Sequence, residues 1–384
     1  MPQLDVDYLI IGAGIAGASV GYWLAPHGRV AVVEREAQPG YHSTGRSAAM
    51  VLKSYGPPQV RALTAASWEF FRAPPVGFSD GALLRERGAL IVASADQRAL
   101  LAEHWTVARA CSPDARVLDA TAALKLVPVL RPERVFQAVL EPDAADIDVH
   151  ALHQGFLRGI RRNGGQVQCG LTIDGIDRTG NDCWTLQAGS ARYRTRVLVN
   201  AAGAWCDEVA RAAGIEPVGL VPKRRSAFTF PAPPGLKVDD WPLCAPIDWS
   251  WYMKPEAAML LGSPANADPV EPQDVQPEQL DIALGIDAIE SWTHLQIRRP
   301  IRMWAGLRSF VADGELVGGF EPDAAGFFWI AGQGGYGVQT SAAMGEACAA
   351  LIQGHPIPGT LASFGVCSAA LSPRRLRVKS IAGS

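Results

Sequence analysis

The sequence predicts an α/β fold in which a Rossmann-like nucleotide-binding domain is joined to a second domain built on an antiparallel sheet. Three observations predict this fold. First, an apolar run, a glycine-rich turn and a helical pattern follow one another at the N-terminus, which is the signature of a βαβ unit. Second, the same order returns twice further along the chain. Third, the stretches between these units are richer in proline and tryptophan and hold short apolar runs, as antiparallel strands do.

The first unit consists of an apolar run at residues 7–11, a helical pattern that reaches 22–24 and a second apolar run at 30–33. Asp148 is a suitable N-cap for a later amphipathic helix. A strand is expected over 165–169, directly after that helix.

Two further buried strands are expected at 197–200 and 327–331, and each runs into a glycine turn. The second of these turns precedes a helix expected over 340–351. Because such distant parallel units are expected to share one sheet, the nucleotide-binding domain is expected to comprise residues 1–50, 145–225 and 301–384. The second domain then comprises residues 51–144 and 226–300.

The composition is that of a globular protein, with 48% hydrophobic and 19% charged residues. A formal net charge of -3 without a long run of one sign gives no field that would attract nucleic acid, so no such partner is expected. The seven scattered cysteines favour a reduced, cytoplasmic protein. No apolar run reaches the ~20 residues of a transmembrane segment, and peripheral contact with a membrane quinone pool stays open.

Gly12, Gly14 and Gly17 form a GxGxxG motif between the expected strand and helix, and Glu34 closes the next strand. Glycines let the backbone approach a pyrophosphate, and the helix N-terminus offers unpaired N–H groups to it. The carboxylate can accept hydrogen bonds from ribose hydroxyls. We therefore expect a dinucleotide cofactor without a 2′-phosphate.

A second signal favours FAD over NAD. Residues 43–49 are mostly small and follow the second strand, where the backbone has to lie along a flavin. The glycine-dense turn at 332–337 precedes a helix whose N-terminus can stabilise negative charge on a reduced isoalloxazine. We expect the FAD to be non-covalent, because Cys206 and Cys348 are better explained as helix-packing residues than as attachment sites.

Five longer segments are more distinctive than a generic nucleotide-binding pattern. They are PGYHSTGRSAA at 39–49, PKRRSAF at 222–228, LGSPANADP at 261–269, WAGLRSF at 304–310 and GQGGYG at 332–337. With them, the chain resembles the glycine and D-amino acid oxidase superfamily of flavoproteins, and within it the D-arginine dehydrogenases. The resemblance implies an FAD-dependent oxidoreductase that acts on D-amino acids.

Position by position, the resemblance implies that Arg225, Tyr252 and Arg308 hold a substrate carboxylate, that Tyr55 covers the active site and that the Gly335 carbonyl meets the substrate amine. A guanidinium fork suits a carboxylate, since paired charge-assisted hydrogen bonds set both its position and its orientation. The residues expected to line the rest of the substrate site are Met50, Ala89, Gln339, Trp249 and Trp251. The residues expected to contact the cofactor are Gly12, Gly14, Ile15, Ala16, Gly17, Glu34, Arg35, Ser43, Thr44, Arg46, Ser47, Ala48, Ala49, Ala202, Gly203, Gly334, Gly335, Tyr336, Gly337, Gln339 and Thr340.

Two departures from the D-arginine dehydrogenase pattern bear on specificity. Ala89 stands where that group has a glutamate for the substrate guanidinium. Met50 stands where it has a histidine, and Leu52 where it has a threonine. A buried guanidinium without a carboxylate is strongly disfavoured, so a preference for neutral, apolar or aromatic side chains is expected.

The expected reaction is hydride transfer from the substrate α-carbon to flavin N5, which gives an imino acid and then a 2-oxo acid and ammonia. Two alternatives stay open, oxidation of a secondary amine and a non-catalytic FAD-binding subunit. The electron acceptor, whether oxygen, a quinone or another carrier, also stays open.

Other candidate sites carry less weight. His150 and His153 lie one helical turn apart without a third ligand, so no metal site is expected. His42 is interpreted as structural, and the basic stretch 374–379 as a solvated end. No GxSxG motif supports hydrolase chemistry.

Overall fold

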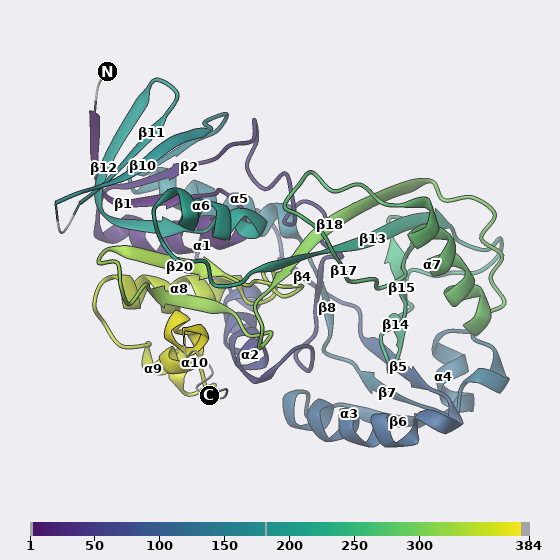
Figure 1. The fold of residues 1–384 in the computed structure, drawn as a ribbon. Coiled ribbons are helices and arrows are strands. Elements are labelled where there is room, and N and C mark those ends of the chain that lie inside the picture. The colour runs from purple at the N-terminus through teal and green to yellow at the C-terminus, as the bar shows by residue number, and fades with distance from the viewer. Residues whose placement is uncertain (1–2, 181–182, 378–384) are drawn as a thin grey trace, which may run out of the picture.

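The computed structural model describes residues 3–180 and 183–377. Two large sheets dominate the molecule, and the chain passes between them several times (Figure 1). The first sheet holds the N-terminal strand, and the second lies at the other side with α3, α4 and α7 beside it. This is the expected α/β architecture of a Rossmann-like domain joined to a second sheet domain.

The first sheet runs in the order β10-β11-β12-β1-β2-β9, with β20 against β12 and β19 against β20. The strands β9, β2, β1, β12 and β20 pair in this order and are parallel to one another, which confirms that distant units share one sheet. The bounds are Gln3–Ile11 (β1), Val30–Val33 (β2), Gln166–Gln168 (β9), Ile173–Thr179 (β10), Cys183–Ala188 (β11), Ala191–Asn200 (β12), Val317–Phe320 (β19) and Phe327–Ala331 (β20).

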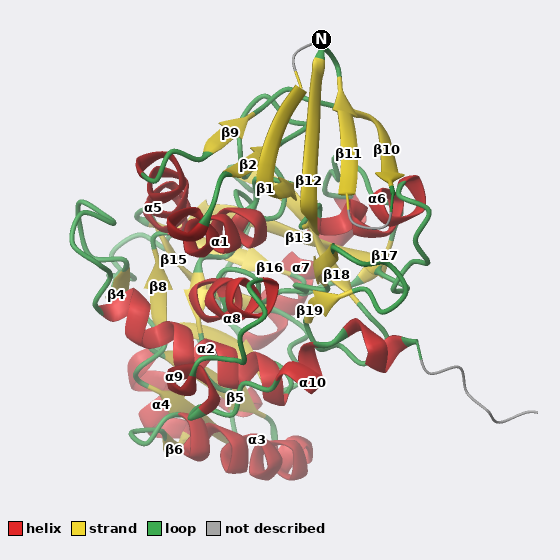
Figure 2. Cartoon of the chain, turned by 90° about the vertical axis from the view of Figure 1, so that its left-hand side faces the viewer, coloured by secondary structure: helices red, strands yellow, loops and turns green. Residues whose placement is uncertain are grey.

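Four helices cover one face of this sheet. They are α1 (Ile15–Leu24), α2 (Pro58–Arg72), α5 (Val149–Arg162) and α8 (Ser341–Ile352), and α1 lies beside α8 (Figure 2). Their apolar side chains form one core with Ile10, Val32 and Val199 of the sheet. The Asp148 carboxylate accepts a hydrogen bond from the Ala151 N–H at 2.8 Å, so α5 begins at the predicted N-cap.

The second sheet runs in the order β17-β13-β16-β15-β14-β5-β7-β6, with β18 beside β13. Its neighbouring strands are antiparallel except for the parallel pair β14 and β5, so the sheet is mixed. The bounds are Ala89–Ala93 (β5), Arg116–Asp119 (β6), Gln137–Glu141 (β7), Val221–Pro231 (β13), Leu243–Pro246 (β14), Tyr252–Glu256 (β15), Met259–Ser263 (β16), Asp268–Pro269 (β17) and Arg302–Phe310 (β18).

The two faces of the second sheet pack on different cores. One face packs on α4 (Ala120–Leu126) and α7 (Gln279–Trp292). The other packs on α3 (Arg98–Cys111) and carries Tyr252 and Ala89. Since side chains alternate along a strand, neighbouring residues of β15 belong to different cores.

The domain limits differ from the expected ones at three elements. Helix α2 packs on α8 in the core of the first domain, although residues 51–144 were expected in the second. Strands β13 and β18 belong over their whole length to the second sheet, so the limits at 225 and 301 are misplaced. The reason is that the alternation of a long strand does not indicate which sheet the strand joins.

Smaller elements complete the described chain. A three-stranded sheet consists of β3 (Met50–Val51), β8 (Ala145–Ile147) and β4 (Leu84–Glu86). The short helices α6 (Cys206–Ala212) and α10 (Ser368–Leu371) contact β12 and β19 of the first sheet, respectively, and α9 (Gly359–Ala362) packs against α2. No helix in the part of the chain that the structure describes is long and apolar enough to span a bilayer.

The basic stretch near the C-terminus is docked rather than solvated as far as Arg377. Arg375 forms an ion pair with Asp313 at 2.7 Å. Arg377 forms one with Glu321 at 2.6 Å and also donates to the carbonyls of Pro217 and Glu216. The prediction of a solvated end is therefore wrong for these residues, because acceptors distant in sequence, among them the buried Glu321, hold them. The rest of the stretch lies outside the described residues.

Candidate active site

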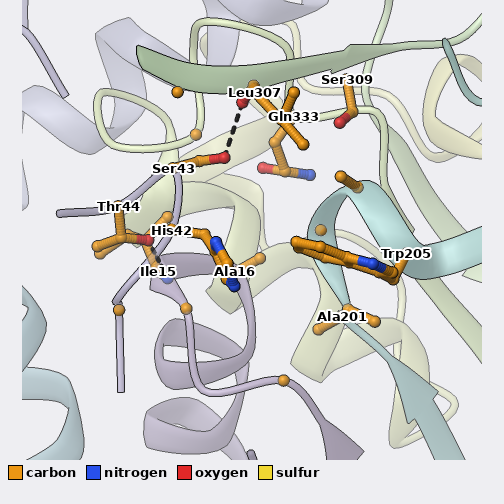
Figure 3. A pocket seen from close by; sticks show the side chains of 18 of the residues that line it. Ile15, Ala16, His42, Ser43, Thr44, Ala201, Trp205, Leu307, Ser309 and Gln333 are labelled. Atoms are coloured by element: carbon orange, nitrogen blue, oxygen red, sulfur yellow. Dashed lines mark hydrogen bonds between the residues drawn. The ribbon is translucent and has the colours of Figure 1, made fainter. Parts of the chain in front are cut away.

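A cavity of about 380 Å³ opens at the carboxyl ends of the parallel strands (Figure 3). The glycine-rich loop after β1 forms its floor, and a Cβ at Gly17 would lie 1.9 Å from the Gly12 carbonyl oxygen. Only glycine allows this tight turn, which aims the N-terminus of α1 into the cavity. The Ile15 N–H donates to the Thr44 hydroxyl at 3.0 Å, which fixes the next loop against the helix.

Glu34 lies where the sequence places it, at the end of β2. One carboxylate oxygen accepts from the Ala13 N–H at 2.8 Å, and the other accepts from the Glu36 N–H at 2.9 Å. The carboxylate therefore lines the cavity beside the glycine loop, in the position from which it can also accept from a ribose.

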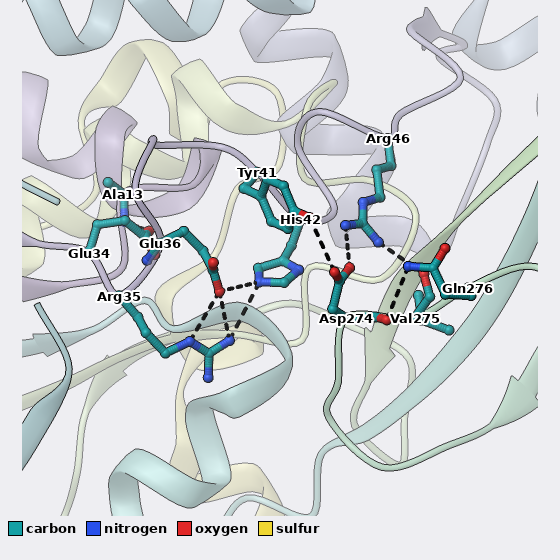
Figure 4. A network of polar contacts seen from close by, with 10 residues as sticks. All are labelled: Ala13, Glu34, Arg35, Glu36, Tyr41, His42, Arg46, Asp274, Val275 and Gln276. Carbon is teal, nitrogen blue, oxygen red and sulfur yellow. Dashed lines mark hydrogen bonds and ion pairs between the residues drawn. The ribbon is translucent and has the colours of Figure 1, made fainter. Parts of the chain in front are cut away.

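A polar network forms the wall beside this loop (Figure 4). His42 is 2.8 Å from Glu36, and this hydrogen bond lowers the pKa of the Glu36 carboxyl below its ordinary value. The His42 and Arg35 side chains both pack on the Trp205 ring, at 4.7 and 4.2 Å from its centroid. His42 thus stabilises the wall of the cavity.

The network continues across the domains through Arg46. Asp274, in the loop after β17, pairs with Arg46 at 2.5 Å and accepts from the Tyr41 hydroxyl at 3.2 Å. The Arg46 side chain also donates to the carbonyls of Val275 and Ala305. Ser43 donates to the Leu307 carbonyl at 2.7 Å. The loop at 43–46 is therefore held between the two sheets.

Arg225 and Arg308 meet at the other end of the cavity. They project from the adjacent strands β13 and β18, two register positions apart, on the face that carries Tyr252. Burial and the nearby Arg308 charge lower the pKa of Arg225 to about 10. Arg225 donates to the Asn266 carbonyl at 2.5 Å, and Arg308 is 3.3 Å from the Tyr55 hydroxyl. Among the described residues, neither guanidinium has a carboxylate partner.

A model of the DAO family, described as FAD dependent oxidoreductases, matches residues 7–351. The chain belongs to this family. FAD-dependent oxidoreductase domain-containing protein 1 from Mus musculus is 25% identical over 92% of this chain and 83% of its own length. Glycine oxidase from Geobacillus kaustophilus superposes with a TM-score of 0.81, 20% identity and coverage of 95% and 99% of the two chains. FAD-bound L-alpha-glycerophosphate oxidase from Mycoplasma pneumoniae superposes with a TM-score of 0.82, 16% identity and coverage of 92% and 95%.

The cofactor of this oxidoreductase is FAD, and the cavity fits it. The backbone cradle at Gly12 and Gly17 has no room for a Cβ, the α1 N-terminus faces the cavity, and Glu34 suits a ribose. Cys206 and Cys348 are buried in the two cores of the first domain and do not line the cavity. The cofactor candidates that line it are Gly12, Gly14, Ile15, Ala16, Glu34, Arg35, Ser43, Thr44, Arg46, Ser47, Ala48, Ala202, Gly203, Gly334, Gly335 and Gly337.

Five of the residues that were expected to contact FAD do not line the cavity. Gly17 contributes by allowing the tight turn between β1 and α1, in which a Cβ would clash with the Gly12 carbonyl. Ala49 directly precedes β3 and has a positive φ of 56°. Tyr336, Gln339 and Thr340 pack behind the glycine turn, and Thr340 and Gln339 are fully or nearly fully buried. Their hydrogen bonds go to other protein groups, so they support the site from behind.

Sequence reasoning missed several residues of the cavity wall. Trp205 is the clearest case, because its ring packs against His42 and Arg35. It follows the glycine turn after the strand at 197–200, so the same strand, turn and helix order could have pointed to it. Residues 171–173 also line the cavity, but no local motif marks them.

The residues expected to contact the substrate lie in two places, and Tyr55, Trp249 and Met50 lie together in the first. Tyr55 lies 4.9 Å from Trp249 and 5.1 Å from Tyr336, measured between ring centroids, and Met50 packs in the same partly buried cluster. The guanidinium of Arg308 occupies the space in which a Cβ at Gly335 would lie, 2.9 Å away. A side chain at this position would therefore displace the Arg308 guanidinium.

Two substrate candidates lie elsewhere. Trp251 is fully buried on the opposite face of the sheet, where it packs 6.2 Å from Trp292. Its prediction as an aromatic wall of the site is wrong, because Trp251 faces the core opposite to that of its neighbour Tyr252, while Trp249, with a positive φ of 54°, lies in the turn before β15. Ala89 lies on the correct face but is fully buried and does not line the cavity. Gln339 also does not line the cavity, and its amide contacts the backbone of Leu52 and Tyr55.

Proposed function

We propose that this enzyme oxidises the α-carbon of an amino acid to the imino acid, which hydrolyses to a 2-oxo acid and ammonia. One observation carries the proposal. Arg225 and Arg308 present two largely buried guanidinium groups, without a carboxylate partner among the described residues, at one end of the FAD cavity. Such a pair is costly unless an anion binds to it. An α-carboxylate is the anion that this chemistry requires.

The surrounding residues can orient such a substrate. Arg225 and Arg308 form two sides of a fork, and Tyr252 extends from the same face of the sheet. Bidentate contacts fix the carboxylate and leave little freedom for the α-carbon. Orientation is the main contribution of these residues, since a small displacement of the reacting C–H bond is expensive. The bound FAD supplies the hydride acceptor.

We also propose a preference for apolar or aromatic D-amino acids. Met50, Trp249 and Trp304 are partly buried in one apolar cluster with Tyr55 and Ala265. These residues do not line the cavity themselves but border it through the contact of Tyr55 with Arg308, and apolar neighbours of this kind favour an apolar substrate side chain over a charged one. The D configuration is supported by the sequence segments shared with the D-arginine dehydrogenases.

The experiment is anaerobic reduction of the purified flavoprotein by D- and L-amino acids, followed through flavin absorbance. Bleaching by D-leucine, D-phenylalanine or D-methionine, with ammonia as the second product, is expected. D-Arginine as the best substrate would contradict the side-chain preference. An alkylamine or a cyclic imine among the products would indicate a secondary amine substrate. A flavin that no amine reduces would favour a non-catalytic FAD-binding subunit.

A further inference from the structure

The segment from Leu52 to Gly56, which joins β3 to α2, carries Tyr55 and is held by buried polar groups. On the side of the first domain, Gln339 accepts from the Leu52 N–H at 3.4 Å and donates to the Tyr55 carbonyl at 3.5 Å. Gln339 is itself held by the Thr64 hydroxyl at 2.9 Å. These contacts tie the backbone of the segment to the loop before α8 and, through Thr64, to α2.

The second domain holds the same segment through Glu141. This residue ends β7 and is fully buried, and one of its carboxylate oxygens accepts from the Ser54 hydroxyl at 2.7 Å. His104 of α3 lies 3.4 Å from that oxygen. The other oxygen, Oε2, is buried and has no partner among the described residues. Beside it, Asp143 holds Lys53 at 2.7 Å.

The position of Glu141 in the sheet suggests two different roles. Glu141 is the register partner of Ala89 and therefore lies on the same face. It could in principle take the cationic end of a substrate side chain, as a glutamate at position 89 would. Glu141 does not line the cavity, however, and Ser54 already occupies one of its oxygens. The contacts favour a role through the segment that carries Tyr55.

We propose that Glu141 is a positioning residue that acts through Ser54 to place the Tyr55 hydroxyl against Arg308. The inference rests on the proposed function, because Arg308 is there a ligand of the substrate carboxylate. The Tyr55 hydroxyl lies 3.3 Å from the Arg308 guanidinium, so a shift of the segment moves one of the groups that set the geometry of that guanidinium. Catalysis and binding are sensitive to displacements of about 1 Å.

The test uses the FAD-loaded protein and the variants Ser54→Ala and Glu141→Gln. Ser54→Ala removes the hydrogen bond, and we expect the KM of the best amino acid and the Kd of benzoate to rise about tenfold, with a smaller change in kcat. Glu141→Gln keeps an acceptor oxygen, so it should stay within about threefold of the wild type. On a Tyr55→Phe background, Ser54→Ala should add little, since both changes act through one hydroxyl.

Thr293→Val is the matched control, because Thr293 is also fully buried and donates a hydrogen bond, to the Ile289 carbonyl at 2.7 Å, at the far end of α7. It should change neither constant. Equal effects of Ser54→Ala and Thr293→Val, or additive effects of Ser54→Ala and Tyr55→Phe, would overturn the inference. Selective loss of D-arginine and D-lysine turnover in Glu141→Gln would instead assign Glu141 to the substrate side chain.

Failure of the proposed function gives a different result. If no amino acid reduces the wild-type flavin but benzoate still binds, the benzoate Kd of the variants continues to test the role of Ser54. If the wild type binds neither benzoate nor amino acids, both the proposed function and the role of Glu141 are contradicted.

Discussion

At the scale of single residues, the candidate site is defined by two cations that lack anions. Arg225 has only a backbone carbonyl as a close acceptor, and Arg308 has only the Tyr55 hydroxyl, among the described residues. Burial removes part of the hydration of both groups; together with the Arg308 charge it lowers the pKa of Arg225, whereas Tyr55 and Tyr252 outweigh burial and raise the pKa of Arg308. Gly335 permits this arrangement by leaving room for the Arg308 guanidinium. A bound carboxylate offsets the lost hydration of both guanidinium groups and the repulsion between them. The affinity for a carboxylate should therefore depend strongly on the charge of these groups.

This coupling predicts a pH dependence of carboxylate binding. The pKa of Arg225 in the empty site is about 10, and a bound anion raises it. Below this pH the guanidinium is charged and the Kd of benzoate should be constant. As the pH rises above 10, a proton has to be taken up on binding, and the Kd should increase by about tenfold per pH unit. Titrations between pH 7 and 11 through flavin absorbance measure this, and Arg225→Met should abolish the rise. A Kd that is independent of pH in the wild type would contradict the coupling.

At the scale of elements, the loop from Glu36 to Arg46 acts as part of the cofactor cavity. It is fixed at one end by His42, which contacts Glu36 and the Trp205 ring. It is fixed at the other end by Arg46, which pairs with Asp274 of the second domain. Thr44, between them, receives the first N–H of α1. The loop therefore couples the α1 N-terminus to the domain that binds substrate.

His42→Ala should weaken FAD binding. The change removes the bond to Glu36 and the packing on Trp205, and the loss of one charge-assisted hydrogen bond corresponds to roughly a tenfold higher Kd. Titration of the apoprotein with FAD, followed through tryptophan fluorescence, measures the Kd without any turnover. His150→Ala, on the exposed side of α5, is the control and should leave the Kd unchanged. Equal affinities for the two variants would show that His42 does not stabilise the cavity.

At the scale of the whole molecule, the C-terminal segment connects parts of the first domain that are far apart in the sequence. Arg375 binds Asp313 in the loop before β19, and Arg377 binds Glu321 after that strand. Glu321 is buried and also accepts from the Trp329 indole N–H at 2.9 Å. The segment thus holds the strand pair β19 and β20, which leads directly into the glycine turn at 332–337.

Arg377→Ala should lower the free energy of unfolding by about 1–3 kcal/mol, since it leaves a buried carboxylate with one hydrogen bond fewer. Urea unfolding of the FAD-loaded protein, followed by circular dichroism, provides the measurement. Arg374→Ala is the matched control, because Arg374 is exposed and makes no ion pair among the described residues. If both variants unfold at the same urea concentration as the wild type, the tail does not stabilise the fold.

The sequence by itself determined the local parts of this protein. The strand, glycine turn and helix units, the Asp148 cap and the place of Glu34 were all predicted correctly, because each depends on neighbours within a few residues or on one strand-to-strand spacing. The arginines, in turn, were singled out only through the resemblance to a known family. Their residue types alone indicate ordinary surface or structural ion pairs more readily than a carboxylate site.

The tertiary structure decided what depends on distant contacts. It joined β13 to β18, which lie more than seventy residues apart, and so placed Arg225 beside Arg308 on one face. In the fold Ala89 is buried and Trp251 faces the opposite core. Gln339 donates to the backbone carbonyl of Tyr55 instead of lining the cavity. None of these outcomes has a local signal, because the face and burial of a side chain are set by the elements packed against it.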